Sequence, residues 1–180
     1  MHIFIMRHGE AANTDTEDSV RPLTKVGIDE TTKMGVWLAN QKLSQIKVFV
    51  SPYLRAQQSC ANVIEAIPEM AINSRVIPET LNLITPSGNA RQVHDFIDGF
   101  FNDTDFFDND KTLDEKQGVL FVSHMPFVSY FIAELTKSTK MPLFATGAIA
   151  IINYNINKMH GELVGMVSPE NAKLIGEGAL

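Results

Sequence analysis

Arg7 and His8 are the residues of this sequence best placed to do chemistry, because they stand directly after a short apolar run, residues 2–6. A guanidinium presents a planar fork that matches the oxygens of a phosphate group. An imidazole nitrogen can act as a nucleophile, an acid or a base near neutral pH. Gly9 follows them and leaves no Cβ in the way of a ligand. One histidine beside one arginine is more often structural, so the pair needs partners from elsewhere in the chain.

Two further apolar runs end in side chains of the same kinds. The run 47–50 stops at Ser51, with Arg55 shortly beyond it, and the run 118–122 leads directly into Ser123 and His124. In a parallel α/β sheet the carboxyl ends of the strands share one edge, and neighbouring strands lie about 5 Å apart. The side chains at the three strand ends are therefore expected to converge on one anion. Such a pocket can transfer a phosphoryl group without a metal ion.

Strands and helices alternate along most of the chain. The expected strands are 2–6, 47–50, 75–78 and 118–122, and the expected helices are 25–41, 53–67, 89–101 and 127–135. This alternation predicts a three-layer α/β/α sandwich around a mostly parallel central sheet. Two more strands, 148–155 and 162–167, predict an antiparallel hairpin at one end of that sheet. Thr24 is expected to be the N-cap of the first helix.

The composition is that of a soluble globular protein, which we expect to be one domain over residues 1–180. The net charge of −6 argues against nucleic-acid binding, so a local cluster of cations must hold any anion. No apolar run approaches the ~20 residues needed to span a bilayer. Cys60 is the only cysteine, which excludes an internal disulfide and favours a reducing compartment. We therefore expect a cytoplasmic protein without membrane contact.

No metal or cofactor is expected. No two histidines have the close spacing of zinc ligands, and there is no second cysteine. The acidic stretch 103–115 does not fit a calcium loop, because Phe107 stands where an oxygen ligand is needed and Asp108 where a glycine is needed. We interpret that stretch as a solvated loop.

Four segments resemble, in the same order, motifs of the histidine phosphatase superfamily, which has the phosphoglycerate-mutase-like fold. They are Arg7-His8-Gly9-Glu10, Arg21-Pro22-Leu23-Thr24 with Gly27, Ser51 to Ser59, and Val122-Ser123-His124. Larger branches of the superfamily insert a long helical cap after the third strand, whereas only one helix and a loop fit between 79 and 118 here. With this minimal cap, the chain is similar to the phosphohistidine phosphatases of the SixA type.

The resemblance implies roles for the four residues at the strand ends. His8 would attack phosphorus through a neutral ring nitrogen and become a transient phosphohistidine. Arg7 and Arg55 would clamp the phosphoryl oxygens and offset their charge in the transition state. His124, in its protonated form, would donate a further hydrogen bond. Water would then hydrolyse the phosphoenzyme.

Three further candidates are less closely defined by the resemblance. Arg21 matches the SixA-type pattern and would add a cation at the rim of the pocket, although a solvated loop arginine is an equal interpretation. Gly9 belongs to the signature and is a candidate for substrate binding. Relatives use a carboxylate near Glu79 as an acid toward an alcohol leaving group, but the residues after Glu79 depart from the larger relatives' motif. An imidazole leaving group also needs less help from an acid, so the role of Glu79 stays open.

The function that the resemblance implies is removal of phosphate from a phosphohistidine on a signalling or phosphotransfer protein. The sequence leaves the oligomeric state open, and a monomer is the expectation. A small-molecule phosphomonoesterase or mutase of the same superfamily is the first alternative, and it would call for a larger cap and a clear acid near Glu79. A non-catalytic module that binds phosphoproteins is the second alternative. Such a module would have no need of the nucleophile His8.

Overall fold

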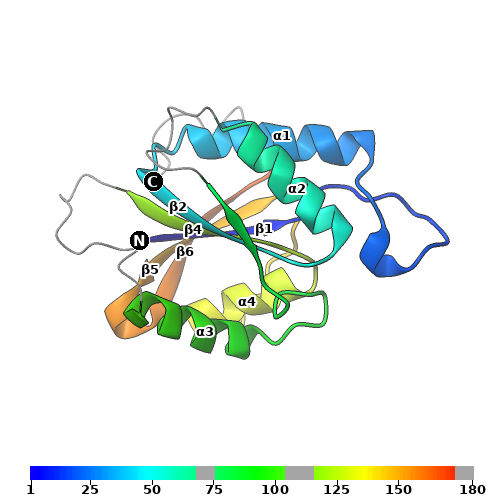
Figure 1. Cartoon of the computed structure of the whole chain (residues 1–180). Coiled ribbons are helices and arrows are strands. Elements are labelled where there is room, and N and C mark those ends of the chain that lie inside the picture. Colours follow the sequence, from blue (N-terminus) through cyan, green and yellow to red (C-terminus); the bar gives the residue numbers. More distant parts are fainter. Residues whose placement is uncertain (68–75, 104–115, 173–180) are drawn as a thin grey trace.

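The computed structural model of the protein, which describes residues 1–67, 76–103 and 116–172, is built around one six-stranded sheet. The strands are β1 (His2–Arg7), β2 (Gln45–Val50), β3 (Pro78–Thr80), β4 (Gln117–Ser123), β5 (Ile149–Asn155) and β6 (His160–Val167). Their order across the sheet is β3-β2-β4-β1-β5-β6. Neighbours are parallel from β3 to β1, whereas β5 and β6 are each antiparallel to the strand before them in this order (Figure 1). The predicted parallel sheet with an antiparallel C-terminal hairpin is confirmed.

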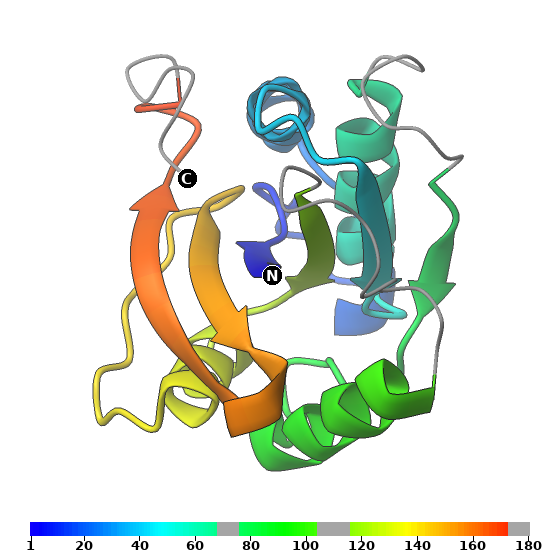
Figure 2. The ribbon, with the colours of Figure 1, turned by 90° about the vertical axis from the view of Figure 1, so that its left-hand side faces the viewer.

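The α-helices cover both faces of this sheet. They are α1 (Lys25–Ala39), α2 (Leu54–Glu65), α3 (Ala90–Asp103) and α4 (Phe127–Thr136), with short 3-10 helices η1 (Asp18–Val20) and η2 (Ile156–Lys158). Helices α1 and α2 lie on one face, and α3 and α4 lie on the other, which gives the predicted three layers (Figure 1, Figure 2). Within the described ranges, no helix is long and apolar enough to cross a membrane.

Both faces of the sheet bury apolar side chains, which explains why β1 is a continuous apolar run. Ile3 and Ile5 belong to the core beneath α3 and α4, and Phe4 and Met6 belong to the core beneath α1 and α2. All four have no exposed surface. Full burial of each such side chain contributes about 1.5–3 kcal/mol. The strand is therefore fixed up to the residue that precedes Arg7.

The register of the sheet brings the ends of three strands level. Arg7 in β1 pairs with Ser123 in β4, and Val50 in β2 pairs with Val122 in β4. The ladder continues one step further, since the His8 N–H donates to the Ser123 carbonyl at 2.9 Å. The residues that follow the three strands therefore meet at one edge of the sheet, as the sequence predicts.

Strand β3 begins later than the predicted 75–78, and residues 68–75 lie outside the described part of the chain. It starts at Pro78, which suits an edge strand because proline has no N–H to donate. Glu79, expected just after the strand, is therefore within it and pairs with Phe49 of β2. Residues 104–115 of the acidic stretch, which we expected to be a loop, likewise lie outside the described part of the chain.

Helix α2 has polar as well as apolar residues on its buried side. Leu54, at the start of the helix, is 37% exposed. The buried residues of the helix are Arg55, Ala56, Ser59, Cys60 and Val63. Burial raises the pKa of the Cys60 thiol to about 12, so the group stays a neutral, unreactive thiol.

Two helical glycines provide a matched test of this packing. A Cβ on Gly35 of α1 would lie 2.6 Å from the Val63 carbonyl oxygen of α2, whereas a Cβ on Gly99 of α3 would meet nothing within 4 Å. We expect Gly35→Ala to lower the free energy of unfolding by about 1–3 kcal/mol through overpacking. We expect Gly99→Ala to raise it by roughly 0.5–1 kcal/mol, since alanine is the better helix former. Urea unfolding measures both, and equal effects of the two substitutions would contradict the close approach of α1 to α2.

Candidate active site

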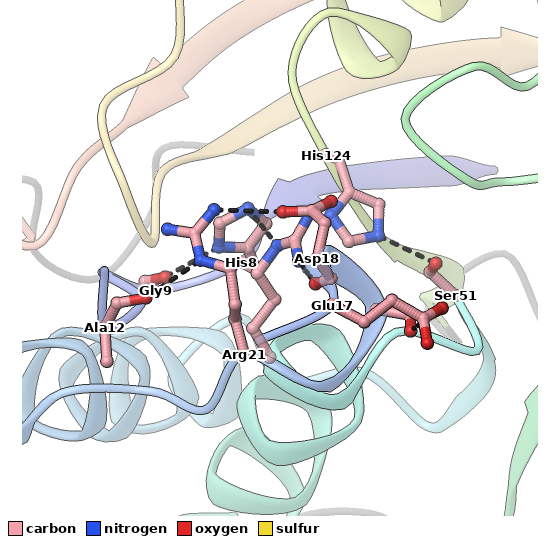
Figure 3. A network of polar contacts seen from close by, with 10 residues as sticks. His8, Gly9, Ala12, Glu17, Asp18, Arg21, Ser51 and His124 are labelled. Atoms are coloured by element: carbon pink, nitrogen blue, oxygen red, sulfur yellow. Dashed lines mark hydrogen bonds and ion pairs between the residues drawn. The ribbon is translucent and has the colours of Figure 1, made fainter. Parts of the chain in front are cut away.

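The structure brings His8 and His124 together at the carboxyl edge of the sheet (Figure 3), and Arg55 contacts His8 there. The ring centroids of His8 and His124 are 5.0 Å apart, and Arg55 Nε lies 3.2 Å from His8 Nε2. All three side chains are buried, with His8 8%, Arg55 5% and His124 1% exposed. Three groups that can carry positive charge are thus held together in a place with little water.

The hydrogen bonds of His8 define which of its nitrogens is free to react. Its Nδ1 lies 2.7 Å from the Gly9 carbonyl oxygen. A carbonyl oxygen can only accept, so Nδ1 carries the proton and donates it. Nε2 then holds a lone pair, which accepts the hydrogen bond from Arg55 Nε. The nitrogen that faces Arg55 is therefore the nucleophilic one.

The surroundings of His8 keep the ring neutral. Burial lowers the pKa of His8 to about 4, and the charges of Arg55, Arg7 and Arg21 act in the same direction. The hydrogen bond to the Gly9 carbonyl opposes this effect but does not outweigh it. At neutral pH the Nε2 lone pair is consequently available without prior removal of a proton.

His124 is also neutral in this structure, which differs from the protonated form expected from the sequence. The pKa of His124 is lowered to about 3, mainly by burial and in part by the nearby His8 and Arg55, while the Asp18 charge acts against them. Its Nε2 lies 2.7 Å from Ser51 Oγ, and its ring forms a T-shaped pair with Tyr53, with the ring centroids 5.0 Å apart. Its Nδ1 is buried and has no hydrogen-bond partner among the described residues.

Arg7 reaches the same edge from the end of β1. Its Nη1 donates to the Phe144 carbonyl at 2.6 Å, which anchors the side chain to the segment before β5. Its Nε is buried and has no partner within the described chain. The guanidinium thus keeps a donor available for an anion.

Arg21 is drawn to the site by a residue that sequence analysis missed, Asp18. Arg21 Nε donates to the Ala12 carbonyl at 2.8 Å, and its Nη1 lies 2.9 Å from Asp18 Oδ1. The other carboxylate oxygen of Asp18 lies 2.9 Å from Arg55 Nη2 (Figure 3). Only one signal in the sequence pointed to Asp18: it stands three residues before the Arg21-Pro22-Leu23-Thr24 segment, which resembles a motif of the superfamily.

Gly9 has a packing role that differs from the ligand approach expected of it. A Cβ at this position would lie 2.5 Å from the Gly27 carbonyl oxygen of α1, so the space is filled by the protein itself. The Gly9 N–H donates to Ser59 Oγ at 3.0 Å, and Ser59 Oγ donates to the Arg55 carbonyl at 2.6 Å. Thr24, the predicted N-cap of α1, accepts from the Gly27 N–H at 3.1 Å, which confirms that prediction. These contacts fasten the turn after His8 to both helices of one layer.

Glu79 is not brought to the site. Its carboxylate forms an ion pair with Lys47 of β2, on the same face as Phe100 of α3. The side chain is more than half exposed. The structure therefore offers no contact between Glu79 and the two histidines.

The polar groups of the site suit an anion rather than a metal ion. Around His8 and His124 the structure places the guanidinium groups of Arg7, Arg21 and Arg55. No cluster of three or more metal-ligating side chains exists among the residues that the structure describes. Guanidinium groups and imidazoles around one small space form a binding site for a phosphoryl group.

A doubly covered, mostly parallel sheet with this arrangement defines a class of phosphoryl-transfer proteins. The family model described as the histidine phosphatase superfamily (branch 1) matches residues 3–77. Relatives that match along nearly the whole chain agree with it, so the chain belongs to the histidine phosphatase superfamily.

Within that superfamily the chain is similar to the phosphohistidine phosphatase SixA of Escherichia coli (strain K12). The two are 36% identical over 174 residues, which cover 97% of this chain and 98% of that one. The SixA homologue of Haemophilus influenzae (strain ATCC 51907 / DSM 11121 / KW20 / Rd) is 34% identical over 164 residues, covering 88% of this chain and 91% of that one. The solved structure of the protein histidine phosphatase SixA complexed with tungstate superposes with a TM-score of 0.79 at 36% identity, covering 95% of this chain and 99% of that one. The resemblance drawn from the four sequence segments is thereby confirmed.

The low pKa values of His8 and His124 make stability depend on pH in a defined direction. In the unfolded chain both histidines take up a proton near pH 6.5, whereas in the folded protein they do so only near pH 4 and pH 3. Between these limits the unfolded state binds more protons. The free energy of unfolding should therefore fall as the pH is lowered from 6.5 to 4, by roughly 1.4 kcal/mol per pH unit for each histidine.

Urea unfolding of the wild type and of the double variant His8→Gln/His124→Gln at several pH values measures this slope. The double variant should lose less stability than the wild type over the same interval, because glutamine does not titrate. Equal slopes would show that the two histidines are not held neutral by burial.

Proposed function

We propose that this protein is a phosphohistidine phosphatase that removes the phosphoryl group from a histidine of a signalling or phosphotransfer protein. The observation that carries the proposal is the buried, unprotonated Nε2 of His8 in contact with Arg55 Nε. The similarity to SixA along almost the whole chain supports the same activity.

In the first step, His8 Nε2 attacks the phosphorus atom in line with the bond to the substrate nitrogen. The new N–P bond forms as the old one breaks, and the departing imidazole keeps the bonding electrons and takes a proton from solvent. The Nδ1–H bond to the Gly9 carbonyl stabilises the phosphorylated ring, which gains positive character. Arg55 Nε is released from Nε2 as the phosphoryl group arrives, and it can then donate to a phosphoryl oxygen.

Arg7 and His124 complete the set of donors in this proposal. The unpartnered Nε of Arg7 and the unpartnered Nδ1 of His124 are both available to phosphoryl oxygens. With the Ser51 hydroxyl donating to Nε2, the neutral ring of His124 carries its proton on Nδ1 and can donate it. A bound phosphoryl dianion would also raise the pKa of His124, since a nearby opposite charge favours the protonated ring.

The second step returns the enzyme to its starting state. A water molecule attacks the phosphorus atom of phospho-His8, the N–P bond breaks, and inorganic phosphate leaves. The electrons of that bond return to Nε2 as its lone pair. Arg55 Nε then re-forms its hydrogen bond to this nitrogen, as the structure has it.

The surroundings of the pocket favour a protein-borne phosphohistidine over a sugar phosphate. Glu79 is paired with Lys47, so no carboxylate from β3 is in place to protonate an alcohol leaving group. Two exposed apolar side chains come directly before pocket residues in the sequence: Val20 before Arg21 is 50% exposed, and Leu54 before Arg55 is 37% exposed. Exposed apolar groups around a polar site are typical of surfaces that bind other proteins. We also propose a cytoplasmic location, which suits the single buried thiol of Cys60.

The test offers the purified protein a phosphohistidine-carrying protein beside p-nitrophenyl phosphate and sugar phosphates. We expect preferential turnover of the phosphohistidine protein and an acid-labile phosphoenzyme. His8→Gln should lower the rate by at least about 10³-fold, because it removes the nucleophile. His160→Gln, which removes a histidine of β6 outside the pocket, is the matched control and should retain the wild-type rate.

Two results would count against the proposal in different ways. Preferential turnover of sugar phosphates would replace the substrate class and keep the mechanism. Full activity of His8→Gln would remove the mechanism itself.

A further inference from the structure

Asp18 lies between two of the guanidinium groups of the pocket. Its Oδ1 is 2.9 Å from Arg21 Nη1, and its Oδ2 is 2.9 Å from Arg55 Nη2. The backbone carbonyl of Asp18 also accepts a hydrogen bond from Arg55 Nη1. Figure 3 shows this carboxylate on the side of His8 and His124.

The carboxylate makes the contacts that an anionic ligand would make. Two oxygens on one centre, each bound by a separate guanidinium, resemble two oxygens of a phosphoryl group. Burial acts to raise the pKa of Asp18, but the hydrogen bonds from Arg55 and Arg21 outweigh it and hold that pKa below its usual value. The group is therefore an anion at neutral pH, and a phosphate must share or take its partners.

The two partners differ in how firmly they are held. The Arg55 side chain is 6% exposed and belongs to the buried face of α2, whereas the Asp18 side chain is 52% exposed. Asp18 opens η1, a 3-10 turn with no buried residue. Displacing Asp18 consequently disturbs little packing, while displacing Arg55 would disturb the core.

Free phosphate and a protein-borne phosphohistidine differ in the contacts that they can make outside the pocket. When free phosphate competes with the Asp18 carboxylate, the polar contacts inside the pocket are the only favourable interactions that it gains. A phosphohistidine on a protein adds contacts between the two protein surfaces, which the carboxylate does not oppose. The carboxylate therefore lowers the affinity for both anions by a similar factor, but the substrate keeps affinity through its further contacts and free phosphate does not.

We propose that Asp18 is an internal anion that competes with phosphate for Arg21 and Arg55, and that it thereby favours release of the product over its retention. The proposal rests on the proposed function, because it takes inorganic phosphate to be the product. If the carboxylate only held the two arginines in position, its removal would weaken the binding of phosphate instead of strengthening it.

The test compares Asp18→Asn with the matched control Glu17→Gln. Asparagine keeps the shape of the side chain and removes its charge. Glu17 carries the same charge one residue away, but its carboxylate accepts from the Ser19 hydroxyl and is exposed. Titration of each protein with inorganic phosphate, followed by NMR of the histidine rings, gives the dissociation constants.

We expect Asp18→Asn to bind inorganic phosphate roughly 5- to 10-fold more tightly than the wild type, the scale of two partly exposed ion pairs. Glu17→Gln should change the affinity by less than about twofold, because its charge is screened by solvent. Asp18→Ala should shift the affinity in the same direction as Asp18→Asn. In hydrolysis of a phosphohistidine protein, added phosphate should inhibit Asp18→Asn more strongly than the wild type.

Unchanged or weaker phosphate binding by Asp18→Asn and Asp18→Ala would overturn the proposal, and so would an equal gain with Glu17→Gln. The binding titration needs no turnover, so it separates the two proposals. If Asp18→Asn binds phosphate more tightly but the wild type does not hydrolyse phosphohistidine, only the proposed substrate is wrong. Normal hydrolysis with unaltered phosphate binding would remove only the role of Asp18.

Discussion

The hydrogen bond from Arg55 Nε to His8 Nε2 is the interaction on which the rest of the site depends. It places a permanent cation beside a nitrogen that must stay unprotonated, and burial makes that arrangement stable by opposing a second positive charge. The same cation that discourages protonation attracts the phosphoryl group. One contact therefore prepares the nucleophile and its electrophile together, provided that both side chains are held in place and kept from water.

The fold supplies those two conditions in separate ways. Parallel pairing of β1 with β4 and of β4 with β2 brings three strand ends to one edge, and apolar layers on both faces exclude water up to that edge. Helix α2 then carries Arg55 on its buried face, where Ser59 links the helix to the turn after His8. The polar residues on the buried side of α2 are thus a consequence of the site, and a hydrophobic pattern alone does not reveal them.

The sequence was sufficient to predict the layers, the hairpin and the meeting of His8, Arg55 and His124, because strand periodicity and motif order depend on local chemistry. It could not predict what depends on tertiary contacts. The protonation of His124 follows from burial, which no local pattern reports. The direction of Glu79 follows from where β3 starts and from its pairing with β2, since successive strand residues point to opposite faces. Asp18 was missed because an acidic residue in an acidic loop looks solvated until its arginine partners are known.

The link through Ser59 divides the pocket into two parts that are carried by different elements. The turn after His8 is joined through Ser59 to α2, the helix that carries Arg55. Arg21 and Asp18 belong instead to the surface segment before α1, which contacts this assembly mainly through side chains. The reacting nitrogen and its neighbouring cation are thus held by the packed core, whereas the outer charges of the pocket stand on, or directly after, a short helical turn that buries none of its residues.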